Sequence, residues 1–144
     1  MKTNPIVLQA ARGLCAAFGI AVSAAPAAAA DLPPEQQQGA VVYRTGGIGE
    51  DEARAMQDAS RQYPLALEFV ARTGEDRGGF LADVDVSIQD RGGNQVLQAK
   101  AAGPFLLARL PAGRYVVTAK NEDSRRSRRV DIPSRGTRRV VFGW

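Results

Sequence analysis

The 144-residue sequence has no histidine and a single cysteine, Cys15. Without histidine there is no imidazole general base, no Ser-His-Asp or Cys-His pair and no histidine-ligated metal. The interleaved aromatic residues of a single-stranded nucleic-acid binder are also missing. Carboxylate pairs, lysine nucleophiles and oxygen-ligated metals remain. We therefore expect a protein that is not an enzyme and that binds neither a cofactor nor nucleic acid.

The first thirty residues have a positive, an apolar and a small-residue region in the order typical of a secretory signal peptide. Lys2 is followed by a mostly apolar stretch at 6–22, and residues 28–30 are Ala-Ala-Ala, a small-residue cleavage site. Arg12 and two glycines interrupt the apolar stretch, which leaves it short of the roughly 20 residues that a membrane-spanning helix needs. We predict cleavage after Ala30, a periplasmic or secreted protein and no transmembrane segment in the mature chain.

Cys15 lies inside this segment, where Arg-Gly-Leu precedes it instead of the small residues of a lipoprotein signal. We expect it to be removed with the signal peptide, so the mature chain has no cysteine. A disulfide, a thiolate nucleophile and a sulfur-ligated metal are then excluded. The fold must be held by its apolar core, which a mature chain of about 114 residues is long enough to form.

Residues 31–63 divide into a leader and a helix. The leader, residues 31–45, contains Pro-Pro and three glutamines and is predicted to be flexible, with a possible short edge strand at 40–43. Glycines at 46–49 predict a turn, and acidic residues at 50–52 suit the first turn of a helix. Four apolar residues then recur at spacings of three, three and four: Ala53, Met56, Ala59 and Tyr63. This spacing predicts one amphipathic helix over about 50–62, stopped by Pro64.

Beyond Pro64 the apolar residues alternate with a period of two. Seven short runs are separated by turn residues, the first of them ended by the glycine-rich stretch 73–79. The predicted strands are 65–71, 84–89, 95–101, 105–110, 115–120, 126–132 and 138–142. This pattern predicts a mainly β protein, a seven-stranded antiparallel sandwich preceded by one short amphipathic helix.

Two phrases resemble the carboxypeptidase regulatory-like domain family. Residues 84–93 read Val-Asp-Val-Ser-Ile-Gln-Asp-Arg-Gly-Gly, and residues 103–117 contain Leu-Pro-Ala-Gly-Arg-Tyr. In the second phrase Pro111 and Gly113 make a tight reversal, Leu110 closes the end of the core and Tyr115 begins the inward face of the next strand. The resemblance covers residues 64–144. It implies a Greek-key, transthyretin-like (prealbumin-like) sandwich that does no chemistry, as in small exported bacterial proteins of unassigned function.

Three acidic residues and one glycine turn are weaker candidate sites. Asp83, Asp85 and Asp90 suggest a carboxylate dyad or a calcium site, but the spacing of a calcium loop is not met, and a solvated strand face is favoured. The glycine turn at 46–49 precedes a helix, yet it lacks the spacing of a phosphate-binding loop, and residues 50–52 would repel a phosphate. We expect no metal site.

The most suggestive feature is the basic C-terminal end. Residues 114–144 hold nine basic and three acidic residues, whereas residues 31–113 hold eight and twelve. Clustered arginines bind phosphate, sulfate or carboxylate groups, so lipopolysaccharide, anionic lipid, acidic glycan or an acidic protein are candidate partners. The alternative is that these charges protect a sheet edge from aggregation. The candidate residues are Arg125, Arg126, Arg128, Arg129, Arg135, Arg138 and Arg139.

The sequence thus favours a non-catalytic, exported interaction module that binds an anionic envelope component or a protein partner through these arginines. One alternative is an assembly accessory whose leader, or whose strand at Tyr43, pairs with the sheet of another protein. A less favoured alternative is a histidine-free hydrolase, which needs Asp83 or Asp85 in a concave pocket.

Overall fold

The computed structural model describes residues 31–72 and 79–144, and this part of the chain forms nine strands and one helix. The predicted signal peptide with Cys15, and nearly all of the glycine-rich stretch 73–79, lie outside the described residues. The elements are β1 (Gln36–Gln38), β2 (Val41–Gly46), α1 (Glu50–Ser60), β3 (Leu65–Val70), β4 (Val84–Gln89), β5 (Gln95–Ala101), β6 (Phe105–Arg109), β7 (Gly113–Asn121), β8 (Ser124–Ile132) and β9 (Arg138–Gly143).

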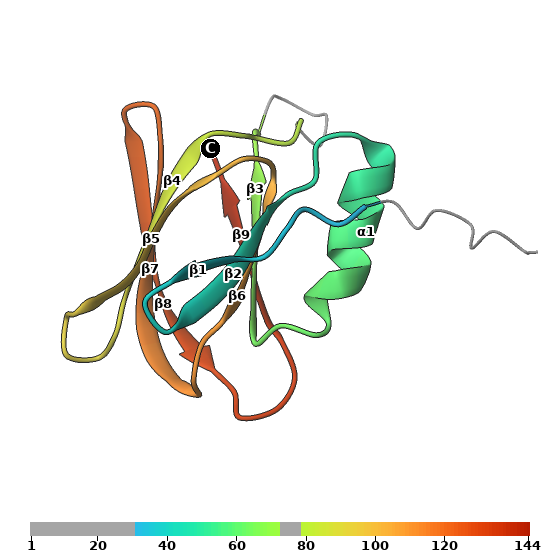
Figure 1. Cartoon of the computed structure of the whole chain (residues 1–144). Helices are drawn as coiled ribbons and strands as arrows, with labels where there is room; N and C mark the ends of the chain where they lie inside the picture. Colours follow the sequence, from blue (N-terminus) through green and yellow to red (C-terminus); the bar gives the residue numbers. More distant parts are fainter. Residues whose placement is uncertain (1–30, 73–78) are drawn as a thin grey trace, which may run out of the picture.

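The strands form two sheets that face each other (Figure 1). One has the order β1-β2-β6-β3-β9 and the other the order β5-β4-β7-β8. The pairs are antiparallel except β3 with β9, which run parallel. Helix α1 covers the outer face of the five-stranded sheet (Figure 1). The prediction of a mainly β protein with one helix is therefore confirmed.

The prediction of seven strands is wrong, because the described residues form nine. The seven predicted runs correspond to β3 through β9, with ends that agree within two residues. The two further strands come from residues 31–45, which were expected to form a flexible leader. β2 was expected as an edge strand at most, but it lies inside the sheet between β1 and β6.

The main core lies between the two sheets. Alternate side chains of β2 through β9 point into it, as the period of two predicts. Leu67, Phe69, Val86, Leu106 and Phe142 are among the side chains buried there. Leu110 and Tyr115 are also buried, and the Tyr115 hydroxyl donates to the Pro111 carbonyl at 2.9 Å. The expected role of the reversal around Pro111 and Gly113 is confirmed.

A second, smaller core lies between α1 and the five-stranded sheet. Met56 is fully buried there between Phe105 and Leu107 of β6 and the alanines of the helix. β6 is thus covered on both faces, by the helix and by the other sheet, which explains its unbroken apolar run. Gly47 lies in the turn between β2 and α1 with a φ of 102°, and a Cβ at this position would collide with the Phe105 ring.

Candidate functional site

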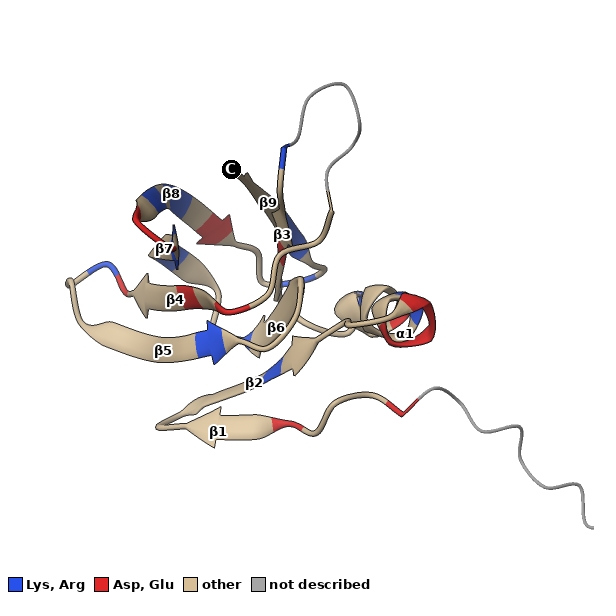
Figure 2. Cartoon of the chain, turned by 90° about the horizontal axis from the view of Figure 1, so that it is seen from above, with Lys and Arg blue, Asp and Glu red and all other residues tan. Residues whose placement is uncertain are grey.

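β8 and β9 are the outer strands of the two sheets on the same side of the sandwich (Figure 2). They carry six of the seven candidate arginines, and the turn between them carries Arg135. All seven side chains are exposed. We call this side of the molecule, formed by β8, β9 and their turn, the arginine edge.

The register between β7 and β8 divides the β8 arginines between two faces. Arg126 pairs with Ala119 and Arg128 with Val117, whose side chains are buried in the core. These two arginines therefore project toward the gap between the sheets. Arg125 and Arg129 project from the outer face of the four-stranded sheet. This division follows the alternation that the sequence predicts.

Two guanidinium groups are held in place where the sheets meet. Arg128 lies over the Phe142 ring, with its Cζ 5.6 Å from the ring centroid. Arg138 Nε donates to the Asp131 carbonyl of β8 at 3.1 Å and so bridges the two strands. Side chains of β8 and β9 line a groove of about 460 Å³ here. Arg139 points to the helix side, where it pairs with Glu68.

The arginine edge carries an excess of positive charge. Of its seven arginines, only Arg139 forms an ion pair with a carboxylate of residues 31–72 or 79–144. Asp131 is the acidic residue within β8, and it pairs with Arg114 of β7. Six guanidinium groups thus remain without an internal anion in the described residues.

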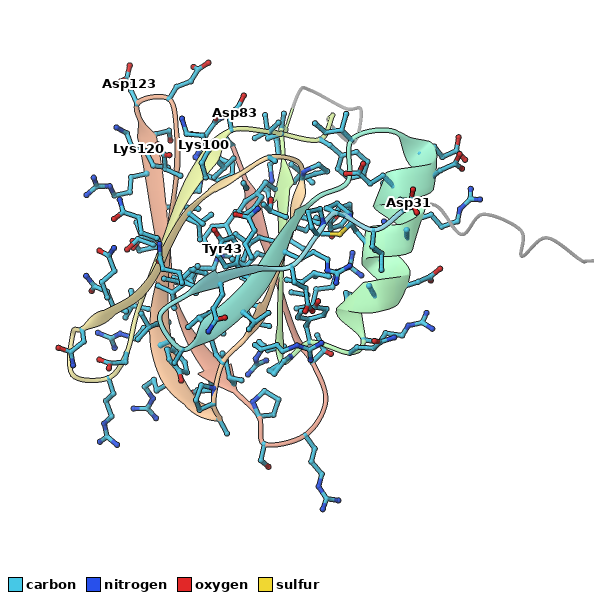
Figure 3. All side chains as sticks on the ribbon, viewed as in Figure 1. Asp31, Tyr43, Asp83, Lys100, Lys120 and Asp123 are labelled. Carbon is cyan, nitrogen blue, oxygen red and sulfur yellow. The ribbon has the colours of Figure 1, made fainter. Side chains whose placement is uncertain are left out.

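Two exposed lysines also lie on the four-stranded sheet, Lys120 on β7 beside β8 and Lys100 on β5 at the opposite edge of the sheet. Lys120 is paired in register with both Arg125 and Asp85, and Lys100 forms an ion pair with Asp85 at 3.9 Å. Figure 3 shows both lysines at the same end of the four-stranded sheet as Asp83 and Asp123. Asp85 thus lies next to both lysines, and the excess positive charge lies with the arginines.

A second polar cluster joins four parts of the chain and was not predicted from the sequence. The Tyr63 hydroxyl donates to the Glu35 carboxylate and accepts from Arg44 Nε at 3.0 Å. Arg44 and Arg109 reach the same carboxylate oxygen at 3.4 and 3.5 Å. The Arg109 guanidinium also stacks on the Tyr63 ring, 4.3 Å from its centroid.

The contacts of this cluster shift two pKa values in opposite directions. The hydrogen bond from Tyr63, with help from Arg44 and Arg109, lowers the pKa of Glu35. Burial raises the pKa of Tyr63, and its bond to the Glu35 carboxylate raises it further. At neutral pH the pair is therefore a neutral phenol donating to a charged carboxylate.

The acidic candidates do not converge on a site. Asp85 is exposed near one end of β4 and pairs with Lys100, whereas Asp90 follows the other end and accepts from the backbone N–H groups of Gly92 and Asn94, both at 2.9 Å. Asp83 is exposed just before β4. The described residues contain no group of three His, Cys, Asp or Glu side chains that could hold a metal ion.

The glycine turn before α1 already donates a backbone N–H to a side chain of the protein. The Glu52 carboxylate accepts the Gly47 N–H at 2.6 Å, where a bound phosphate would have to lie.

In the described part of the chain, no helix is long and apolar enough to cross a membrane.

No family model matches the sequence, and no curated protein matches it. Among solved structures, the Bacillus anthracis TIE protein is similar over 56% of this chain, with 16% sequence identity and a TM-score of 0.44. The alignment spans only 16% of that chain. A likeness of this size gives no information on what either chain binds. The strand pairing itself defines the two sheets of the fold.

Proposed function

We propose that this protein is a non-catalytic, exported module that binds the phosphate or carboxylate groups of an anionic component of the cell envelope through its arginine edge. The observation that carries the proposal is the set of six arginines without a carboxylate partner among the described residues. Guanidinium groups bind such oxyanions through two parallel N–H donors, and neighbouring arginines suit a ligand with repeated negative charges.

The positions of two arginines support this function. Arg128 is held against Phe142, and Arg138 against the Asp131 carbonyl. Each keeps further N–H donors for a ligand, because a guanidinium has five. A side chain already fixed by such contacts loses less conformational entropy when it binds. The groove between β8 and β9 gives an extended ligand a place to lie along the strands.

Protection of the sheet edge is the competing explanation. β8 is nine residues long and has no neighbour on its outer side in its sheet, so charged side chains there discourage pairing with other chains. This explanation predicts aggregation when the arginines are removed, but no specific loss of anion binding. The two explanations are separated by a binding experiment.

The experiment measures binding to phosphatidylglycerol vesicles and to lipopolysaccharide, with phosphatidylcholine vesicles as the neutral reference. In the test variant Arg125, Arg126, Arg128 and Arg129 are replaced with serine. We expect the affinity to fall at least about tenfold, because four exposed ion pairs at roughly 0.5 kcal/mol each exceed the roughly 1.4 kcal/mol of a tenfold change. Comparing the two ligands distinguishes a lipid headgroup from the phosphates of lipopolysaccharide.

A matched control carries the same change in net charge elsewhere. Its serine substitutions are at four exposed basic residues away from the arginine edge: Arg54, Arg61, Arg91 and Lys100. The proposal requires the control to bind nearly as well as the unmodified protein. Equal losses in both variants would mean that only net charge matters, and the proposal would be wrong. Aggregation of the test variant with unchanged binding would support edge protection instead.

We also propose that residues 64–144 form a Greek-key sandwich of the carboxypeptidase regulatory-like, transthyretin-like type. What supports this is the way the chain crosses between sheets. β6 lies beside β3 and β7 beside β4, so these neighbours within a sheet are not consecutive in sequence. The chain passes from one sheet to the other between β3 and β4, between β5 and β6, between β6 and β7 and between β8 and β9, as in Greek-key connections.

A further inference from the structure

β1 lies at the opposite edge of the five-stranded sheet from β9. Much of its attachment to the sandwich comes from hydrogen bonds of side chains. Its backbone pairs with only three residues of β2, and its own three side chains are exposed. The Tyr43 hydroxyl donates to Gln36 at 2.9 Å, and the Gln38 amide exchanges hydrogen bonds with the Gln98 backbone at 3.0 and 2.6 Å. β1 can therefore leave without opening either core.

The strongest attachment precedes β1, at Glu35. Arg44, Tyr63 and Arg109 all contact one oxygen of its carboxylate. Tyr63 is only 3% exposed, and Arg109 is held by the Tyr63 ring and by the Gln62 carbonyl at 3.1 Å. These three side chains thus form a carboxylate-binding site whose geometry depends little on Glu35 itself, and their two positive charges exceed its single negative one.

Residues 31–38 use the edge of β2 incompletely. β2 has six residues, but only Val41, Val42 and Tyr43 pair with β1. Pro33 lies against Gly46 at the far end of β2, and prolines have no N–H to donate to a strand ladder. An extended peptide without these prolines would make more backbone hydrogen bonds to β2.

We infer that the edge of β2, together with Arg44, Tyr63 and Arg109, is a binding site for an extended acidic peptide of a partner protein, and that residues 31–38 occupy it as a built-in competitor. The partner strand adds to the sheet, and its glutamate takes the place of Glu35 opposite Arg44. This site lies on a different side of the sandwich from the arginine edge and does not depend on the function proposed there.

The probe is a fluorescent peptide with the sequence of residues 31–38 in which both prolines are replaced by threonine. Binding to the purified protein is followed by fluorescence polarisation. The built-in competitor lowers the apparent affinity by the fraction of molecules in which it is released. Glu35→Ala in the protein weakens the competitor, so we expect it to tighten peptide binding about tenfold or more.

Two changes should abolish this binding: Arg44→Gln in the protein, and glutamine in place of glutamate in the peptide. The four-serine variant of the β8 arginines is the matched control and should bind the peptide like the unmodified protein. Equal binding of the glutamate and glutamine peptides would overturn the inference, as would weaker binding to the Glu35→Ala variant when its thermal unfolding shows that it is folded.

A reversible lock tests the same point without altering the carboxylate site. Gln37 and Val42 are register partners, at a separation that suits a disulfide, and the sequence has no cysteine after Cys15. The double variant Gln37→Cys/Val42→Cys should bind no peptide when oxidised and should bind it once reduced. Binding by the oxidised monomer would overturn the inference. So would a covalent dimer, because the strand would then come from a second copy of the chain.

Discussion

Tyr63 connects an apolar core with a polar cluster at the molecular surface. Its ring packs with Met56 and Phe105 beneath α1, while its hydroxyl contacts Arg44 and Glu35. The residue follows the last helical turn and precedes Pro64, so the chain has little freedom to move it. One side chain thus couples the position of the helix to the attachment of the N-terminal segment.

The lowered pKa of Glu35 predicts how this attachment depends on pH. Because the folded pKa lies below the ordinary value of 4.5, the ionised carboxylate stabilises the fold at all pH values above about 4.5. That contribution is lost as the pH falls through the lower folded pKa. Urea unfolding of Glu35→Gln and the unmodified protein should differ by a constant amount near neutral pH and converge in acid. A difference that grows in acid would contradict the assignment.

Substitutions at Tyr115 test separately how its hydroxyl and its ring stabilise the reversal at residues 110–115. Tyr115→Phe removes only the hydroxyl that donates to Pro111, and we expect a loss of about 0.5–1.5 kcal/mol in the free energy of unfolding. Tyr115→Ala also empties part of the core and should cost about 3–5 kcal/mol. Chemical denaturation measures both. Equal losses of unfolding free energy in the two variants would mean that the aromatic ring does not stabilise the fold.

At the scale of elements, α1 is attached to the sheet by one large side chain between two small ones. Met56 is fully buried, and Ala53 and Ala59 let the helix approach closely. Met56→Ala should therefore lower the free energy of unfolding by about 2–5 kcal/mol, as judged by chemical denaturation. The exposed neighbour Gln57 supplies the control, since Gln57→Ala should change it by less than about 0.5 kcal/mol. Similar effects of the two would refute this packing.

The sequence predicted β3 through β9 because most of these strands alternate between core and solvent, and because β6 is an unbroken apolar run between turn residues. β1 left no such signal, since Gln-Gln-Gln is exposed on both faces and is fixed by a short backbone ladder and side-chain amides. β2 was underestimated for another reason. Its inward side chains Val41 and Tyr43 were recognised as a possible strand, but no local pattern reveals that residues 36–38 fold back to cover its edge.

The two candidate sites also differ in how far the sequence predicts their contacts. The division of Arg125 and Arg129 from Arg126 and Arg128 follows from alternation within a single strand, so it was predictable. The contacts of Arg138 with β8 depend on which strands become neighbours, which alternation cannot determine. The cluster around Tyr63 brings together residues up to 74 positions apart, and no local pattern indicates that they become neighbours.

For the molecule as a whole, export is the prediction that decides which residues meet the partner. If residues 1–30 are a signal peptide, intact-mass spectrometry of protein recovered from the periplasm should give a chain that begins at Asp31. Glu35 would then be the fifth residue of the mature chain, so the segment that contains it would be attached to the fold at one end only. Recovery of a chain that retains residues 1–30 would contradict the prediction.

The parallel pairing of β3 with β9 also governs when the protein can fold. β3 lies between β6 and β9, so half of its hydrogen-bonding edge stays bare until residue 143 has been synthesised. Phe69 likewise lacks its stacking partner Phe142 until then. Contacts this distant in sequence are slow to form. The five-stranded sheet therefore cannot be completed until nearly the whole chain has been synthesised.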